Sequence, residues 1–373
     1  MKVCYFGTYR AEYNRNKIMI AALRSAGVDV TICHENLWRS IEDREIVTAG
    51  GWRNPEFLWR VIKAYTKLII KSFSIGDFDV MVLGYPGQFD VFLARIISSL
   101  KKKPLVWDVF MSIYLVAKER GLEESPHSAV NFLKRMEKRG LGIPKLLIQD
   151  TLQYVDWIQQ THGIDPERFM IVPTGADDNI FKPTEQVEPK RYKFRVLYYG
   201  TFIANHGLDQ ILEAVKLLES KNDVEFLFIG EGPEKARIVQ KAEIKNLENV
   251  TFIGWCSQPE LVDQIRKSDL CLGAFGNTPQ SLMTVQNKIY ECMACGKAVI
   301  TGTSPAVRSQ FTDEVELKIC ERTGESIAET ILYLKENPDL LEKIGHNARE
   351  TFVDHFSVAA LGKTFRKHLE TLL

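Results

Sequence analysis

The sequence lacks the features that mark membrane-spanning and secreted proteins. It has no apolar run near the roughly 18 residues that a membrane span requires. Its first residues, MKVCYFG, lack the charged region and the apolar region of a secretory signal. The seven cysteines are odd in number and scattered among apolar neighbours, which is typical of unpaired thiols in a reducing compartment. We therefore expect a cytoplasmic protein.

Metal-binding, nucleic-acid-binding and dehydrogenase signatures are also lacking. Cys292 and Cys295 form a C-x-x-C inside a helical pattern, and no second pair completes a zinc site, so we expect no metal. The 48 Lys and Arg residues balance 48 Asp and Glu residues, which argues against a nucleic-acid partner. The first glycine turn, FGTYRAEYN, has no G-x-G-x-x-G for a dinucleotide.

Short apolar runs alternate with helix-period stretches along the whole chain, as in parallel sheets covered on both faces. A chain of 373 residues with 45% hydrophobic residues has room for two such domains. Strands are predicted at Val3 to Phe6, Val28 to Cys33, Val80 to Leu83, Leu105 to Trp107, Leu146 to Ile148, Phe169 to Val172, Phe194 to Tyr199, Val224 to Ile229, Val250 to Ile253, Leu270 to Ala274 and Ala298 to Ile300.

A proline-rich, charged stretch interrupts this rhythm and divides the chain. We expect an N-terminal Rossmann-like domain over residues 1–178, a linker over 179–193 and a C-terminal Rossmann-like domain over 194–354. A last helix, about residues 355–373, is expected to pack back on the first domain. Ligand sites of such domains lie on the loops after strands, so function is expected there.

The stretch TVQNKIYECMACGKAVIT carries the strongest site signal. It places Asn287, Lys288 and Glu291 at the start of a predicted helix, with Lys288 and Glu291 on one face. Helix-terminal amides, an ammonium and a carboxylate one turn later can hold a diphosphate and a ribose. The alternative is an ordinary lysine and glutamate on a solvated helix face.

Three further loops follow predicted strands of the second domain. Gly200 and Thr201 open one loop that leads to His206, and a Gly230-Glu231-Gly232 turn forms the next. Trp255 follows the third strand and is a candidate to lie against a base, although a tryptophan packed between helices is an equal alternative.

Taken together, YYGTF…HGLDQILEA, LFIGEGP, VTFIGW and LGAFGNTPQSLMTVQNKIYECMACGKAVIT resemble the C-terminal domain of the retaining glycosyltransferase family four, glycosyl transferases group 1. The resemblance implies the GT-B fold, in which two doubly wound domains face each other across a cleft. It implies that Glu291 binds the donor ribose and that the loop from Ser281 to Lys288, with Thr284, Val285 and Asn287, surrounds the donor's sugar and diphosphate.

The sequence departs from the family pattern at three positions. The first glutamate of the E-x7-E motif is Met283, the usual lysine is His206, and the usual arginine is Thr201. Lys288 is therefore the candidate to supply the lost cationic charge, and Lys288 and His206, with the helix-terminal amides, are expected to stabilise the departing diphosphate. The expected activity is metal-independent, retaining transfer of a sugar from a nucleotide-diphospho-sugar, with UDP or GDP as nucleotide and no other cofactor. The implied acceptor is a glycan, glycolipid or lipid-linked hydroxyl in cell-surface polysaccharide or glycoconjugate assembly.

Candidate residues in the first domain also follow strands. Gly7 and Thr8 are expected to line one side of the site, against the donor or the acceptor. The expected acceptor contacts are Arg15, Asn16, Tyr85 and Gln88. Asp108 ends a strand and is either the base that receives the acceptor's proton or the cap of a helix over Val109 to Ala117.

The sequence allows more than one interpretation of the stretch from Phe57 to Phe73 and of the activity. The basic, apolar stretch from Phe57 to Phe73 suits peripheral contact with the inner face of the plasma membrane, but also a core-facing helix with snorkelling lysines. A nucleotide-sugar epimerase on the same frame, or a non-catalytic nucleotide-binding scaffold, would use much of the same site. Isomerised free donor would identify the epimerase, and tight nucleotide binding without slow donor hydrolysis would identify the scaffold.

Overall fold

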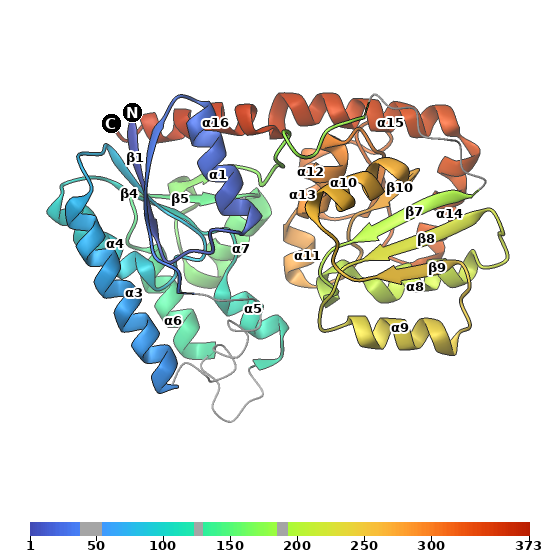
Figure 1. Ribbon diagram of the computed structural model, residues 1–373, viewed down its shortest axis with the longest axis horizontal. Helices are drawn as coiled ribbons and strands as arrows, with labels where there is room; N and C mark the ends of the chain where they lie inside the picture. The colour runs from blue at the N-terminus through green and yellow to red at the C-terminus, as the bar shows by residue number, and fades with distance from the viewer. Residues whose placement is uncertain (38–53, 123–129, 185–192) are drawn as a thin grey trace. The chain divides into compact units, whose positions relative to one another are not determined.

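The computed structural model describes residues 1–37, 54–122, 130–184 and 193–373. Most of the predicted linker, residues 185–192, lies outside the described residues. The chain forms two compact units, Met1–Pro173 with Val358–Leu373, and Thr174–Ser357. Each unit contains a parallel sheet with helices on its faces (Figure 1).

The sheet of the first unit has the order β2-β1-β3-β4-β5-β6 in the described part of the chain. Its register pairs Val3 with Val30 on one side and with Val80 on the other. Its strands are β1 Lys2–Gly7, β2 Asp29–His34, β3 Val80–Leu83, β4 Leu105–Asp108, β5 Leu146–Gln149 and β6 Phe169–Ile171. Its helices are α1 Asn14–Ser25, α3 Pro55–Ser74, α4 Asp90–Leu100, α5 Ile113–Glu119, α6 Val130–Leu141, α7 Leu152–His162, the short η3 Pro166–Arg168 and α16 Val358–Glu370.

The last helix belongs to the first unit because its apolar face is buried against α1. Leu361 and Phe365 of α16 share a core with Met19 and Leu23 of α1 and with Tyr5 of β1. Gly362 gives α16 this close approach, because a methyl group there would collide with the carbonyl of Ala22.

The sheet of the second unit has the order β12-β11-β10-β7-β8-β9 over the described residues. Its strands are β7 Phe194–Tyr199, β8 Val224–Ile229, β9 Val250–Ile253, β10 Leu270–Leu272, β11 Val299–Gly302 and β12 Lys318–Cys320. Its helices are η4 Ala204–His206, α8 Leu208–Leu217, α9 Lys235–Ile244, α10 Gln258–Lys267, α11 Pro279–Met283, α12 Asn287–Ala294, α13 Pro305–Gln310, α14 Gly324–Glu336, α15 Pro338–Thr351 and the π-helical turn η5 Phe352–Phe356.

Strands of the second unit are apolar on both faces. Leu197 and Tyr199 of β7 enter one core with α12, whereas Val196 and Tyr198 enter the opposite core with α8. This is the pattern expected of a parallel strand covered by helices on each side. Two tyrosines at the end of β7 therefore reach opposite faces of the same sheet edge.

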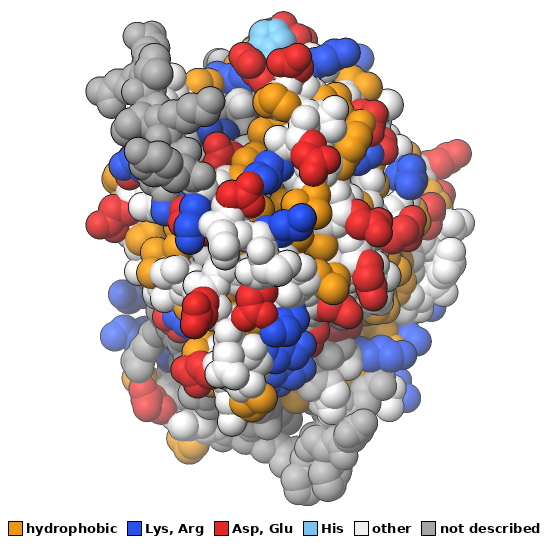
Figure 2. All heavy atoms as spheres, turned by 90° about the vertical axis from the view of Figure 1, so that its right-hand side faces the viewer, with side chains coloured by type: hydrophobic (Ala, Val, Ile, Leu, Met, Phe, Trp, Pro, Cys, Tyr) orange, Lys and Arg blue, Asp and Glu red, His pale blue; other side chains and the backbone are white. Residues whose placement is uncertain are grey.

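The exposed side of the second unit mixes charges of both signs, and Figure 2 shows acidic and basic side chains interspersed on that face. Arg237 and Lys241 of α9 both contact Asp209 of α8, which accounts for part of this pairing. Among the described residues drawn there, charges of neither sign predominate, so nothing in them favours a polyanion.

Candidate functional site

The loops after β7 and β10 meet at the point where the second sheet reverses its strand order. Phe275, after β10, donates its main-chain N–H to the carbonyl of His206, after β7, at 3.0 Å. A methyl group at Gly207 or Gly276 would collide with the main chain of the opposite loop. Gly207 also has a φ of +67°, which favours glycine. Such a reversal is where doubly wound sheets bind ligands.

Helix α12 begins beside these loops and presents an uncapped N-terminus. Gln286 precedes it and makes no side-chain cap, so the side chain leaves the first amides of the helix to other partners. Lys288 and Glu291 lie one turn apart and are only 5% and 6% exposed. The sequence placed both at a helix start, and they are buried rather than on a solvated face.

Glu291 is held by the phenol at the end of β7. The hydroxyl of Tyr199 donates to Glu291 Oε2 at 2.8 Å. Burial raises the pKa of Tyr199 well above 10, so the phenol stays protonated and donates. This hydrogen bond fixes one carboxylate oxygen on the side of the β7 loop.

Lys288 lies against three groups that cannot neutralise it. Its Nζ is 3.4 Å from Nδ1 of His206 and 4.1 Å from the centre of the Tyr198 ring. A methyl group at Gly200 would lie 3.2 Å from the same Nζ, so the main chain of the β7 loop borders the ammonium. Within the described residues its ammonium forms no ion pair.

Burial, with no ion pair to Lys288 among the described residues, sets the protonation of this cluster. Desolvation lowers the pKa of Lys288 from 10.5 to about 7, although Cys292 and Glu291 raise it in part. Desolvation, and then the nearby Lys288, lower the pKa of His206 well below 6.5. Nδ1 of neutral His206 has one lone pair, which can accept a hydrogen bond from Lys288 or from Tyr198, whose hydroxyl is 2.8 Å away. An anion placed here would restore the charge of Lys288.

The remaining predicted donor residues surround this cluster to different degrees. Gly230 packs on Gly200, where a methyl group would collide with the Gly200 carbonyl. Glu231 pairs with Lys235 at 2.6 Å, and Trp255, at the end of β9, is 55% exposed. Gly232 packs on the main chain of the β7 loop, and Thr201 accepts a hydrogen bond from Tyr198.

The loop before α12 can contact a ligand through its main chain more than through its side chains. Val285 is in the core, so only its backbone can face a ligand. The hydroxyl of Thr284 donates to the carbonyl of Gln280 at 2.8 Å. Asn287 is partly exposed at the first position of α12.

Arg322 is a buried cation that the sequence analysis missed. Its guanidinium donates to the carbonyls of Thr303 and Gly276 and to the hydroxyl of Ser281, which joins the ends of β10, β11 and β12 to α11. Burial lowers the pKa of this guanidinium. Its position after a three-residue strand, β12, left no signal in the hydrophobic pattern.

Asp108 and Arg15 bond each other in the structure and do not have the positions that their predicted roles require. Both side chains are fully buried, and Arg15 donates to both carboxylate oxygens of Asp108 at 2.9 Å. Arg15 also donates to the carbonyls of Val172 and Pro173. A carboxylate held in this way has no open edge for an acceptor hydroxyl. Asp108 and Arg15 therefore form a buried structural ion pair, in place of the predicted base and the predicted acceptor contact. The helix-cap alternative is wrong, because Ser112 caps the helix that begins at Ile113.

The other predicted residues of the first unit are tied into loop contacts. Thr8 donates its N–H and its hydroxyl to Asp90, and a methyl group at Gly7 would lie 2.8 Å from the same carboxylate. The amide of Asn16 bonds the main-chain N–H and carbonyl of Tyr85.

Gln88 is the last of the predicted residues in the first unit. Asp150 is a further buried residue of this unit, which the sequence analysis missed. Gln88 donates to the carbonyl of Met111 at 2.8 Å. Asp150 follows β5, and burial raises the pKa of its carboxyl to about 7. A carboxylate directly after a strand was the available signal.

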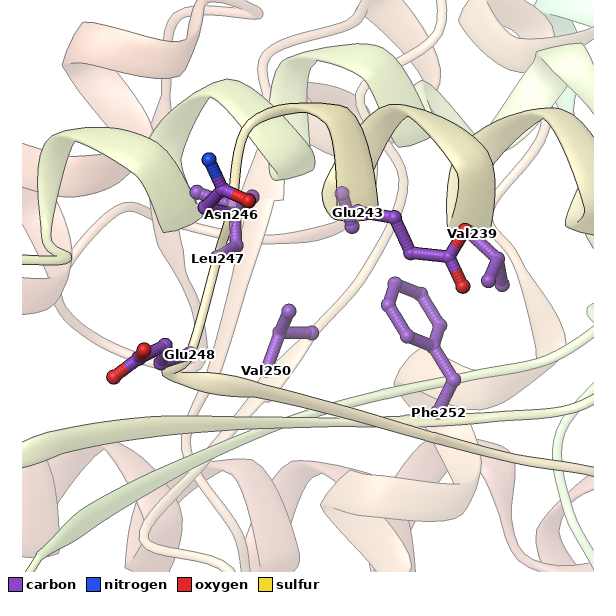
Figure 3. A pocket seen from close by; sticks show the side chains of 8 residues that line it. Val239, Glu243, Asn246, Leu247, Glu248, Val250 and Phe252 are labelled. Carbon is purple, nitrogen blue, oxygen red and sulfur yellow. The ribbon is translucent and has the colours of Figure 1, made fainter.

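A groove of about 320 Å³ lies between α9 and β9 (Figure 3). Phe252 and Val250 line its floor, and its charged residues, Glu243 and Glu248, are acidic. This charge disfavours a phosphate, and none of the predicted site residues lines the groove.

The decisive comparison concerns the unit that holds the Lys288 cluster. Residues 181–351 match the family Glycosyl transferases group 1. The resemblance drawn from the motifs is confirmed, and with it the broad class of glycosyltransferase. No curated protein matches the chain.

Solved structures extend the comparison to both units of the chain. HepE of Anabaena, solved with UDP, has a TM-score of 0.72 at 15% identity, with 100% of each chain covered. Sucrose-phosphate synthase of Thermosynechococcus elongatus has a TM-score of 0.75 at 15% identity, covering 100% of this chain and 99% of that one. A glycosyltransferase of Rickettsia africae has a TM-score of 0.70 at 14% identity, covering 100% and 98%. At such identities the likeness shows the fold, and the GT-B expectation is confirmed.

In the described part of the chain, none of the helices combines the length and the hydropathy that crossing a bilayer requires.

Proposed function

We propose that this protein is a retaining glycosyltransferase that moves a sugar from a nucleotide-diphospho-sugar to an acceptor hydroxyl. One observation carries the proposal: Lys288, at the uncapped start of α12 and against Gly200, is a buried ammonium without a counter-ion in the part of the chain that the structure describes. A diphosphate supplies the anion that this arrangement lacks. UDP is our first choice of nucleotide, supported by the HepE structures with UDP and UDP-glucose, and GDP is the second.

Each residue of the cluster has a part in holding the donor. Lys288 and the first amides of α12 bind the diphosphate, and Gly200 lets the β7 loop approach it without a side chain. Glu291, positioned by Tyr199, accepts hydrogen bonds from the ribose hydroxyls. His206 holds Lys288 by accepting from Nζ, which keeps the ammonium aimed at the leaving group.

Departure of the diphosphate is the step that this site stabilises. The bond between the anomeric carbon and the phosphate oxygen breaks, and negative charge develops on that oxygen beside Lys288. The acceptor hydroxyl attacks the same face of the sugar, and its proton passes to the leaving phosphate oxygen. In our proposal a fixed lysine takes the place of a divalent cation, so no metal is required.

The direct test is a transfer reaction followed by NMR of the anomeric proton. We expect a product with the donor's anomeric configuration, formed at the same rate in EDTA, and slow donor hydrolysis when no acceptor is added. An inverted product would refute retention, and loss of activity in EDTA would refute metal independence. Isomerised free donor would favour the epimerase, and tight binding with no hydrolysis would favour the scaffold.

The proposal also includes the class of the acceptor and the location of the enzyme in the cell. Resemblance to the family supports a glycan, glycolipid or lipid-linked acceptor in cell-surface polysaccharide or glycoconjugate assembly, and a cytoplasmic enzyme. Incorporation of labelled sugar into a lipid-extractable product, rather than a water-soluble one, would support the lipid-linked acceptor.

A further inference from the structure

Helix α3 of the first unit is apolar on two sides, and the described residues cover only one of them. Ala64, Leu68 and Ser72 face the core. Six large side chains outside that face are 38% to 75% exposed: Leu58, Trp59, Ile62, Ile69, Ile70 and Phe73. At 3.6 residues per turn these six fall within an arc of about 120° beside the buried face. The helix therefore presents a continuous apolar stripe to its surroundings.

One edge of this stripe is basic. Lys63, Lys67 and Lys71 follow it on the side away from Leu58, one turn or so apart. Lys67 and Lys71 share a single carboxylate, that of Glu35, so this edge keeps a net positive charge. An apolar stripe beside a lysine edge is typical of helices that lie in a membrane interface.

Helix α4 runs beside the second half of α3 (Figure 1) and carries exposed apolar side chains of its own. The hydroxyl of Tyr65, in the middle of α3, donates to Asp90 at 2.6 Å, and Lys101 donates to the carbonyl of Ile75 at 3.1 Å, so both ends of α4 are joined to the second half of α3. Three exposed apolar residues recur at every fourth position of α4, and lysines follow its end; the residues are Phe92, Ile96, Leu100, Lys101, Lys102 and Lys103.

We propose that this α3–α4 face, defined by the exposed apolar residues of the two helices and their lysines, docks on an anionic lipid bilayer. Lipid tails cover apolar side chains of any arrangement, while phosphate headgroups neutralise the lysine edge and the exposed Lys102; Lys103 already pairs with Asp77. A symmetric dimer through the same face would bring two basic edges together, which opposes it. The docking rests on surface chemistry alone and does not depend on the donor site.

Flotation with lipid vesicles tests the proposal on the full chain. We expect the protein to float with vesicles of equal parts phosphatidylglycerol and phosphatidylcholine, and to bind pure phosphatidylcholine vesicles much more weakly. Ile62→Ser with Ile70→Ser should lower the lipid-bound to free ratio by about tenfold or more. Lys63→Glu should weaken binding to the anionic vesicles alone.

A matched control uses Leu217→Ser with Ile244→Ser in the second unit, residues that are 49% and 71% exposed, against 57% and 64% for Ile62 and Ile70. The control should float like the wild type, and all variants should unfold at the wild-type temperature because the changed side chains are exposed. The proposal is overturned if the wild type fails to float, if the control loses binding equally, or if light scattering finds a dimer that Ile62→Ser with Ile70→Ser dissociates while vesicle binding is absent. Nucleotide binding to the second unit is measured in parallel, so failure of the donor site is seen separately.

Discussion

Replacing Lys288 by methionine should stabilise the second unit while it weakens donor binding. Methionine has a similar length and no charge, and the ammonium it removes is 5% exposed without a counter-ion among the described residues. The pKa of Lys288 falls from 10.5 in a free side chain to about 7 here. At 1.36 kcal/mol per unit, burying this charge costs the folded state about 4 kcal/mol at pH 7. The Lys288→Met variant should gain a large part of that free energy of unfolding.

The gain should depend on pH with a known sign. Since the folded pKa lies below the unfolded pKa, the unfolded chain binds more protons between pH 7 and 10.5, and the wild type becomes more stable as pH rises through this window. The variant lacks this titration. Its advantage should therefore be greatest below pH 7 and should shrink by about 1.4 kcal/mol for each pH unit above 7.

Urea unfolding at pH 6.5, 8 and 9 measures this difference. The transition of the second unit is the one that the donor nucleotide shifts in the wild type, which matters because two units need not unfold together. Lys245→Met, at an exposed lysine after α9, is the matched control and should change stability by less than about 0.5 kcal/mol at every pH. A Lys288→Met protein that is less stable than the wild type, or an advantage that does not change with pH, would refute the reasoning.

Three further predictions concern the same networks. Affinity for a nucleotide sugar should fall by up to about tenfold per pH unit above 7, because the bound diphosphate requires charged Lys288; a flat calorimetric profile from pH 6.5 to 8.5 would contradict this. Arg15→Met leaves Asp108 buried and unpaired and should cost the first unit about 3 to 5 kcal/mol in urea unfolding, with nucleotide binding unchanged; a cost under about 1 kcal/mol would show that the ion pair is dispensable. Tyr199→Phe should raise the nucleotide Kd about tenfold, since a hydrogen bond to a charged group is worth about 1.5 to 3 kcal/mol; an unchanged Kd would deny the phenol its role in positioning Glu291.

Strand positions were predictable because buried parallel strands are short apolar runs between glycine and proline signals. Val80–Leu83 and Val224–Ile229 have the bounds that their runs predict. β12, Lys318–Cys320, was missed because a three-residue edge strand with a lysine has no such run. Arg322, which follows it, was missed with it.

Side-chain pairing was less predictable than strand order. The sequence put Asp108 at the end of a strand and Arg15 near the start of a helix, but two residues 93 positions apart carry no signal that they bond each other. Lys288 and Glu291 could be placed on one helix face, whereas their burial depends on Tyr198 and Tyr199, which only the fold brings there. The assignments of these residues to donor binding stay predictions.

Titration calorimetry of UDP, GDP and ADP against the wild type and Glu291→Gln tests the central claim, that the second unit binds a nucleotide diphosphate through the α12 cluster. Glutamine keeps the shape of the side chain and removes the charge that Tyr199 orients. The account predicts that UDP, or failing that GDP, binds the wild type and that the variant loses about tenfold or more in affinity. Wild-type protein that binds none of the three nucleotides, or a variant that binds as tightly as the wild type, would contradict it.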